Sequence, residues 1–63
     1  MDAKVVRIKK NVFEIQDRKP VKIALPGDRG IVVRKGFSGL FVVNGRTGET
    51  IYVMNGEYEY EGV

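Results

Sequence analysis

The 63-residue sequence contains no cysteine, no histidine and no tryptophan. Without cysteine, neither a disulfide bond nor a thiolate metal site can stabilise the fold. Without histidine, the chain lacks the commonest zinc ligand and the usual general base near neutral pH. No Ser–His, Cys–His or lysine-based nucleophile motif is present, and Asp17, Asp28, Glu49 and Glu57 fall in separate turns without metal-ligand spacing. These absences predict a protein that is not an enzyme and holds no metal and no other cofactor.

Long apolar runs are missing as well. None approaches the roughly 20 residues that span a bilayer, and the N-terminal MDAKVV lacks the apolar segment of a signal peptide. We therefore expect a cytoplasmic protein that binds no membrane, folded as one domain over residues 1–63. A chain this short buries only about 60% of its unfolded surface, so a compact barrel, an oligomer or a large partner must supply stability.

Charge is present but unevenly distributed. Residues 1–35 contain ten Lys and Arg against four acids, whereas residues 36–63 contain one Arg against four Glu. The first part is therefore +6 and the second −3. A basic end of this kind attracts phosphate backbones or acidic partners, although it can also be an ordinary solvated face. The composition, rich in Lys, Arg and Glu with a single Gln, is also typical of a thermophile.

The first half of the chain shows short alternating segments bounded by turn residues. Alternation of apolar and polar residues predicts three strands, over 3–10, 12–16 and 21–25. Turns are predicted at Asp17 to Pro20 and at Pro26 to Gly30, where Asp28 and Arg29 are expected to be solvated at the tip. Backbone N–H groups of the second turn could also bind a phosphate. Residues 3–16 fit a short amphipathic helix as an alternative.

The stretch from Ile31 to Tyr60 reads as four alternating strands joined by three short glycine-bearing turns. Asn55-Gly56 favours a two-residue type I′ hairpin, which would pair Val53 with Tyr58. The loop from Gly45 to Gly48 pairs Phe41 with Tyr52 when closed as four residues. The loop from Gly36 to Gly39 likewise pairs Arg34 with Phe41, Val33 with Val42 and Val32 with Val43.

These registers sort the side chains consistently onto two faces. The predicted core face comprises Ile31, Val33, Leu40, Val42, Ile51, Val53, Tyr58 and Tyr60. The opposite face comprises Val32, Arg34, Phe41, Val43, Thr50, Tyr52, Met54, Glu57 and Glu59. The alternating glutamates of the last strand are expected to protect a sheet edge from aggregation.

The second face contains too many apolar residues for a solvent face, so something must cover it. The N-terminal strands or a bent, barrel-like sheet could cover it, with Arg34 packed on Phe41 and Tyr52. It could instead be a nucleic-acid platform, on which aromatic rings stack on bases or wedge between them while cations neutralise phosphates. A protein interface or homodimer face is the third alternative.

The segment Val21 to Val33, VKIALPGDRGIVV, resembles the KOW-type motif of SH3-like barrels. Gly27, Gly30 and the apolar Ile31 to Val33 stand at matching places, and the following strands with a short GxxG loop suit the same barrel. KOW modules contact RNA or protein in ribosomal proteins and transcription elongation factors. The resemblance covers about half the chain and implies an RNA-binding or protein-binding role.

The sequence therefore predicts an all-β, SH3-like barrel of five or six short antiparallel strands with little or no helix. We expect a small, basic nucleic-acid-binding protein, with RNA or a ribosome-like assembly slightly favoured over DNA. A protein-interaction module or a homodimer is the alternative. The predicted binding residues are Lys4, Arg7, Lys9, Lys10, Arg29, Arg34, Lys35, Phe37, Phe41 and Tyr52.

Overall fold

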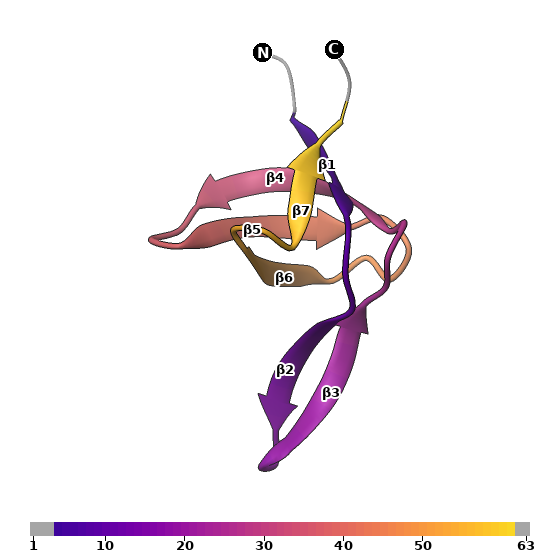
Figure 1. Cartoon of the computed structure of the whole chain (residues 1–63), viewed down its shortest axis with the longest axis vertical. Helices are drawn as coiled ribbons and strands as arrows, with labels where there is room; N and C mark the ends of the chain where they lie inside the picture. The colour runs from indigo at the N-terminus through magenta and orange to yellow at the C-terminus, as the bar shows by residue number, and fades with distance from the viewer. Residues whose placement is uncertain (1–3, 62–63) are drawn as a thin grey trace.

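The computed structural model describes residues 4–61, which form an all-β protein of short antiparallel strands (Figure 1). The strands are β1 (Val5–Ile8), β2 (Val12–Gln16), β3 (Lys19–Ala24), β4 (Arg29–Lys35), β5 (Gly39–Asn44), β6 (Thr50–Met54) and β7 (Tyr58–Tyr60). Within residues 4–61 there is no helix, so none that could cross a membrane. The helical alternative for residues 3–16 is therefore wrong over its described part, because β1 and β2 are extended there.

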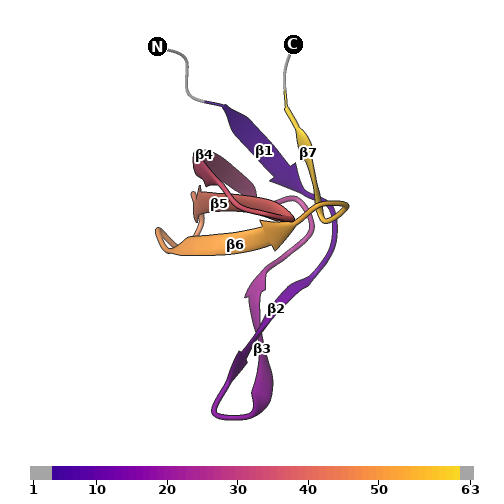
Figure 2. The same cartoon turned by 90° about the vertical axis from the view of Figure 1, so that its left-hand side faces the viewer.

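The strands form two sheets. The larger has five strands in the order β6-β5-β4-β1-β7, and the smaller is the hairpin β2-β3. Figure 2 shows β1 and β7 steeply inclined to β4, β5 and β6, while the hairpin projects from the opposite side. The sheets do not close into a barrel, since β6 and β7 are both edges of the larger sheet. The chain is correspondingly elongated, with extents of 38 × 23 × 21 Å.

The predicted register between β5 and β6 is confirmed. Phe41 lies opposite Tyr52, and Leu40 lies opposite Val53. Gly39 pairs with Met54 at the end of this ladder, and a Cβ there would lie 2.1 Å from the Val53 carbonyl oxygen. Only glycine allows the two backbones to approach so closely. Gly39, the last residue of the GxxG loop, therefore packs directly against the β6 backbone, and a residue with a side chain does not fit there.

The register between β4 and β5 is correct at one end and wrong at the other. Arg34 does lie opposite Phe41, but Val42 pairs with Val32 rather than with Val33. A β-bulge between Val32 and Arg34 leaves Val33 without a partner in this ladder. Because a one-residue shift moves side chains to the other face, Ile31 and Val33 are exposed, contrary to prediction. Val32 packs against the core instead.

The predicted hairpin between β6 and β7 is wrong. Glu57 N–H does donate to the Met54 carbonyl, at 3.0 Å, but only Gly56 of the two central residues has a positive φ, of 96°. A type I′ turn needs positive φ at both, and the ordinary turn types splay the strands that they join. The chain therefore diverges, and β7 pairs with β1, placing Tyr58 opposite Ile8 and Tyr60 opposite Val6.

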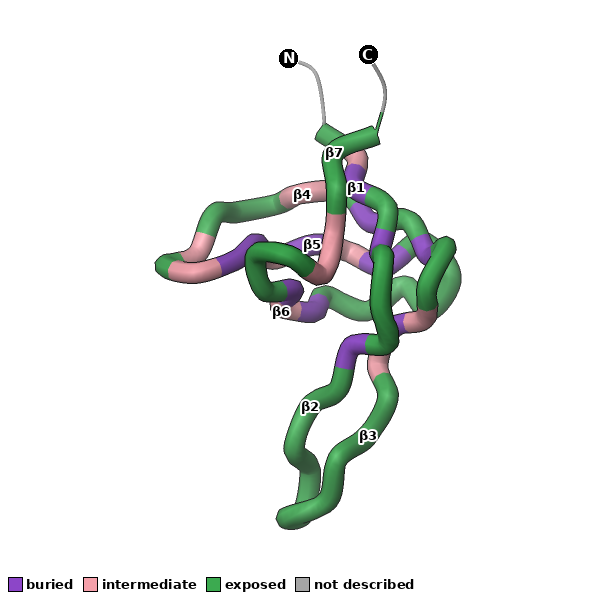
Figure 3. Tube along the Cα trace, in the orientation of Figure 1, coloured by how far each residue is buried: buried purple, intermediate pink, exposed green. Residues whose placement is uncertain are grey.

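The buried core is small and draws on both sheets. Figure 3 shows that the buried segments gather where β1, β4, β5 and β6 meet the base of the hairpin. Tyr58 packs partly against this core, whereas Tyr60 is half exposed, so only one of the two predicted tyrosines contributes. The buried apolar side chains are Val6, Ile8, Val12, Ala24, Leu40, Val42, Ile51 and Val53.

A buried carboxylate joins two turns of the sheet. Asp28 is only 8% exposed, and its Oδ2 accepts hydrogen bonds from Leu25 N (2.9 Å) and Asn44 Nδ2 (3.0 Å). Its Oδ1 accepts one from Arg46 Nε at 2.9 Å. These contacts, with the Arg46 bond largest, lower the pKa of Asp28 from 3.8 to about 2 against the opposing effect of burial. The expectation that Asp28 is solvated is therefore wrong.

Candidate nucleic-acid interface

The predicted binding residues do not form one surface. They fall in three places: the outer face of β1 and the start of β4, the far end of the β4–β5 hairpin, and the neck that leads into β2. Figure 1 shows the β4–β5 loop at the opposite end of the sheet from the point where β3 leads into β4. The three places differ in their charges and in the side chains that contact them.

The cations on β1 and at the start of β4 lie beside acids. Arg7 contacts Glu59, which is its register partner on β7, and Arg29 Nε lies 3.0 Å from Glu61 Oε2. Lys4 Nζ lies 5.6 Å from the centre of the Tyr60 ring. The wrong pairing predicted for β7 concealed these contacts, since it placed the glutamates beside β6. The basic character of this face is largely neutralised.

The Arg34, Phe41 and Tyr52 part of the predicted cross-strand row is present at the other end, whereas Glu59, predicted to follow Tyr52, lies opposite Arg7. Arg34 Cζ lies 4.5 Å from the Phe41 ring centre, and the Phe41 and Tyr52 ring centres are 4.8 Å apart at 57°. Both rings are half-buried. A guanidinium over a ring and a tilted ring pair are each favourable contacts in their own right. Phe41 is therefore already stacked by a side chain of this chain.

The loop after β4 covers Tyr52. The Tyr52 hydroxyl accepts a hydrogen bond from Ser38 N at 3.0 Å, and Cε1 lies 2.5 Å from where a Gly36 Cβ would be. Gly36 is thus required for the loop to lie against the ring. This arrangement answers what covers Phe41 and Tyr52, whereas Met54 on the same face stays half exposed. It also leaves Phe37 fully exposed in the loop, two residues after Lys35.

The largest concentration of unopposed positive charge lies on the projecting hairpin. We define the arm as residues 9–24, which comprise β2, β3, their turn and the short neck before β2. The arm contains five Lys and Arg against two acids, whereas the rest of the chain contains six of each. The whole net charge of +3 therefore resides on the arm. Its cations are Lys9, Lys10, Arg18, Lys19 and Lys22, all exposed.

The tip of the arm is a tight hairpin turn. Asp17 and Arg18 have φ values of 50° and 64°, and Gln16 pairs with Lys19 across them. Positive φ at both central residues is the type I′ geometry that matches the twist of a hairpin. Asp tolerates this region, but it is uncommon for Arg. Pro20, predicted to lie in the turn, instead belongs to β3 opposite Ile15.

The two faces of the arm differ in polarity. One carries Phe13 opposite Lys22 and Ile15 opposite Pro20. The other carries Glu14 and Gln16, whose side chains are joined by a 3.0 Å hydrogen bond from Gln16 Nε2 to Glu14 Oε2, with Val21 opposite Glu14. Phe13 is 55% exposed and Ile15 69% exposed. The first face is thus a bare apolar strip with cations beside it and at its end.

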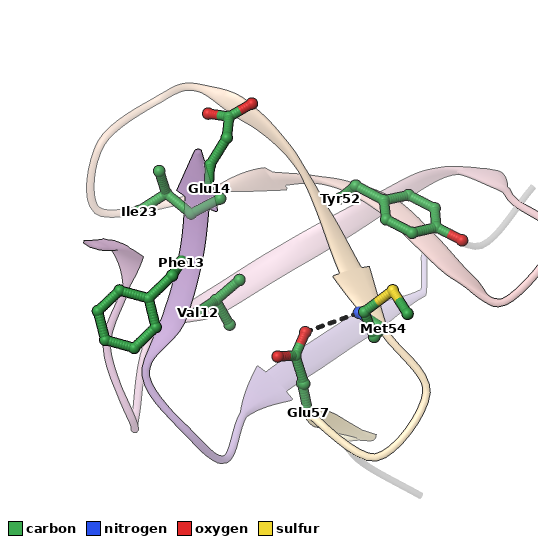
Figure 4. A pocket seen from close by; sticks show the side chains of 7 residues that line it. All are labelled: Val12, Phe13, Glu14, Ile23, Tyr52, Met54 and Glu57. Carbon is green, nitrogen blue, oxygen red and sulfur yellow. Dashed lines mark hydrogen bonds between the residues drawn. The ribbon is translucent and has the colours of Figure 1, made fainter. Parts of the chain in front are cut away.

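A groove of about 240 Å³ lies where the arm meets the sheet. Figure 4 shows the Phe13 and Tyr52 rings on opposite sides of it, with Val12, Met54 and Glu57 between. Glu57 is not free there, because its Oε1 accepts a 2.8 Å hydrogen bond from Met54 N. The groove is smaller than the roughly 300–1,000 Å³ of typical ligand pockets. Beside it, Phe13 stays more than half exposed although Val12 is buried in the core.

The candidate phosphate site finds no support in the geometry. The turn from Pro26 to Gly30 has two of its N–H groups occupied: Gly27 N donates to the Ile8 carbonyl (2.8 Å) and Asp28 N to the Leu25 carbonyl (3.0 Å). They are not available to a phosphate. Within the described range 4–61, no three acids gather in a way that could hold a metal ion.

Sequence reasoning missed Arg18, Lys19, Lys22, Phe13 and Ile15 as candidate binding residues. It treated residues 12–25 as ordinary barrel strands, although their polar residues and turn were visible. The available signal was the Phe13 and Ile15 alternation next to a basic turn, which only the projection of the hairpin makes meaningful. Comparison of the chain with known protein families, curated proteins and solved structures finds no match.

Proposed function

We propose that this protein is a small, non-enzymatic nucleic-acid-binding protein whose main contact is the arm. The observation that carries the proposal is that the whole net positive charge lies on one exposed, projecting hairpin. Charge concentrated on a narrow element raises the local potential more than the same charge spread over a sheet. A polyanion is the partner that this distribution fits.

The mechanism is neutralisation of phosphates by the arm cations. Each phosphate contact releases condensed counterions, so affinity falls steeply as salt increases. Arg7 and Arg29 contribute less in this scheme because Glu59 and Glu61 already oppose them. Phe37, with Lys35 beside it, provides a second contact at the far end of the sheet, where a bare ring can stack on an unpaired base.

The test is a pair of charge-matched variants. One replaces Arg18, Lys19 and Lys22 by Gln, and the control replaces Lys4, Arg7 and Arg29 by Gln. Both remove three positive charges, so net charge cannot distinguish them. We expect the arm variant to lower the slope of log affinity against log salt by about 2–3, and the control to lower it by less than about 1. Fluorescence anisotropy with labelled RNA and DNA measures both.

Equal slopes for the two variants would contradict the role of the arm. No binding by the wild type at low salt to RNA, single-stranded DNA or duplex DNA would contradict the proposed function as a whole. Circular dichroism establishes that both variants fold. All six replaced side chains are exposed, so loss of folding is not expected.

We further propose that the fold is an opened SH3-like barrel. The strand order supports this: β4, β5 and β6 form a meander, and the last strand returns to pair with the first. The arm then occupies the connection between the first two barrel strands. The resemblance to KOW-type modules favours RNA among the nucleic acids. The shape of the arm instead favours duplex DNA.

A homodimer is the second candidate, and the exposed apolar strip of the arm is the observation that favours it. Two copies would have to bring together two arms of charge +3, which repel each other at low salt. Sedimentation at low and high salt separates the candidates. A dimer held by apolar contacts strengthens with salt, whereas nucleic-acid binding weakens.

A further inference from the structure

The rung next to the tip of the arm is apolar and uncovered. Ile15 lies directly opposite Pro20, and both are exposed. Figures 1 and 2 both show this end of the arm pointing away from the rest of the chain. No part of the described chain packs on the pair. Soluble proteins usually place polar residues at such a tip, so an apolar pair here indicates a contact outside the molecule.

Cations outnumber acids around this apolar pair. Arg18 forms the tip together with Asp17, Lys22 lies on the same face as the pair opposite Phe13, and Lys19 lies on the other face opposite Gln16. A partner must therefore offer negative charge around an apolar surface. Duplex DNA can provide this arrangement, because phosphates line the groove edges and the apolar faces of two base pairs become accessible between them when a base step is unstacked. A second copy of the chain, itself positive on the arm, does not.

We propose that the Ile15–Pro20 pair inserts between base pairs from the minor groove of duplex DNA and bends it, an inference that rests on the proposed nucleic-acid binding. Ile and Pro belong to the side chains that wedge between base steps in the minor groove, and such wedges kink the duplex by about 20–90°. The narrow groove also attracts Arg, which the tip provides.

The shape of the arm separates DNA from RNA. A two-stranded ribbon fits the major groove of B-form DNA, and ribbons also bind the minor groove where the duplex is deformed and the groove widened. A-form RNA has a major groove that side chains cannot enter and a minor groove too shallow to hold a tip. The structure therefore favours duplex DNA as the partner, in contrast to the RNA that the KOW resemblance implies.

The backbone at the tip is a second observation. Arg18 occupies the left-handed region at φ 64°, where glycine or asparagine would be unstrained. A cation is thus present at a position that the backbone disfavours. Strained residues of this kind cluster at functional sites. Arg18 precedes the wedge in space, so it is placed to contact a phosphate or the groove floor first.

The experiment uses a DNA duplex of about two helical turns with a central TA step and a donor and acceptor dye at its ends. The TA step is the flexible kind that kinks most easily. We compare the wild type with a double variant, Ile15→Ser and Pro20→Ser. The matched control is Ile31→Ser and Val33→Ser, which removes two exposed apolar side chains from β4 and leaves the arm unchanged.

We expect the wild type and the control to raise energy transfer between the ends as the duplex bends. The double variant is expected to bind about tenfold more weakly, with an unchanged salt slope and no rise in energy transfer. An unchanged slope shows that the phosphate contacts remain. Netropsin, which occupies the minor groove, should compete with the wild type for the duplex.

Other outcomes overturn the inference in distinguishable ways. Equal bending by the double variant and the wild type would show that the pair is not a wedge. Binding of single-stranded RNA but not of duplex DNA would reject the inference and leave the proposed function standing. Absence of binding to every nucleic acid would reject both. A loss of self-association in the double variant, measured by sedimentation, would assign the pair to a dimer contact instead.

Discussion

The arm and the five-stranded sheet use the same kinds of residue in opposite ways. In the sheet, Ile51 is 6% exposed and Arg7 lies beside an acid, so apolar and basic side chains both serve the fold. In the arm, Ile15 is 69% exposed and Arg18 lies at the bare tip. An isolated two-stranded hairpin is only marginally stable, and this one is anchored by Val12 and Ala24 at its base. The outer arm therefore contributes little to the stability of the fold, and its exposed residues can contact a partner.

A matched pair of isoleucine variants tests most directly whether the sheet and the arm differ in their contribution to stability. Ile51→Ala should lower the free energy of unfolding by about 3 kcal/mol, because it removes a buried side chain and leaves a cavity. Ile15→Ala should change it by less than about 0.5 kcal/mol. A domain this small has only about 3–5 kcal/mol in total, so the first variant should be largely unfolded at 37 °C. Urea unfolding at low temperature measures both.

Equal effects of the two isoleucine variants would mean that the arm folds against something in solution and is not bare. A concentration-dependent melting temperature would then identify a second copy as that partner.

The next expected effect concerns Asp28 and pH. Its pKa is lowered from 3.8 to about 2 in the folded protein, chiefly by Arg46. A carboxylate with a lowered folded pKa contributes stability above its unfolded pKa and loses it as pH falls through the folded value. The wild type should therefore lose about 1–2 kcal/mol of unfolding free energy between pH 4 and pH 2. This figure is reduced from the full linkage value because Arg46 is half exposed.

Two variants isolate this carboxylate from the others that titrate nearby. Asp28→Asn should be less stable than the wild type at pH 6, and the difference should shrink towards pH 2. Glu49→Gln removes an exposed carboxylate and should retain the wild-type pH profile. An Asp28→Asn profile parallel to that of the wild type would show that the Leu25, Asn44 and Arg46 contacts do not stabilise the charge. DNA binding should be unaffected, because Asp28 lies in the turn before β4 and not in the arm.

The sequence was sufficient to predict the strands and the pairing of β5 with β6, but not the full register of β4 or the partner of β7. Phe41 opposite Tyr52 followed from alternation and a four-residue loop, and both are local properties. The bulge at Val33 could not be predicted, because the alternation of apolar and polar residues does not show where a strand gains one unpaired residue. The Asn55-Gly56 signal was misleading, since the turn type depends on where β7 finds a partner, and that partner is 50 residues away on β1.

The residue types of the candidate site could be predicted from the sequence, but their positions in the fold could not. An excess of Lys and Arg is visible in any count, and the Arg34–Phe41 contact was correctly placed. Which cations lie beside acids depends on the pairing of β7 with β1, so Arg7 and Arg29 looked free when they are not. Whether Phe13 and Ile15 face a core or water depends on tertiary packing, which alternation does not encode.

The smallest expected effect concerns Arg18 at the arm tip, where one substitution should change the free energy of unfolding and the affinity for DNA in opposite directions. Arg18→Gly removes the strain of a non-glycine residue at φ 64°, and we expect it to raise the free energy of unfolding by about 0.5–1 kcal/mol. The greater backbone freedom of glycine in the unfolded chain offsets part of this gain. The same change removes one arm cation, so the salt slope of DNA binding should fall by about 1. Lys4→Gly removes an exposed cation that lies outside the arm and provides the comparison for binding. A variant that gains stability and loses affinity shows that this position favours binding over folding. A variant that gains stability with no change in salt slope would place the phosphate contacts elsewhere on the arm.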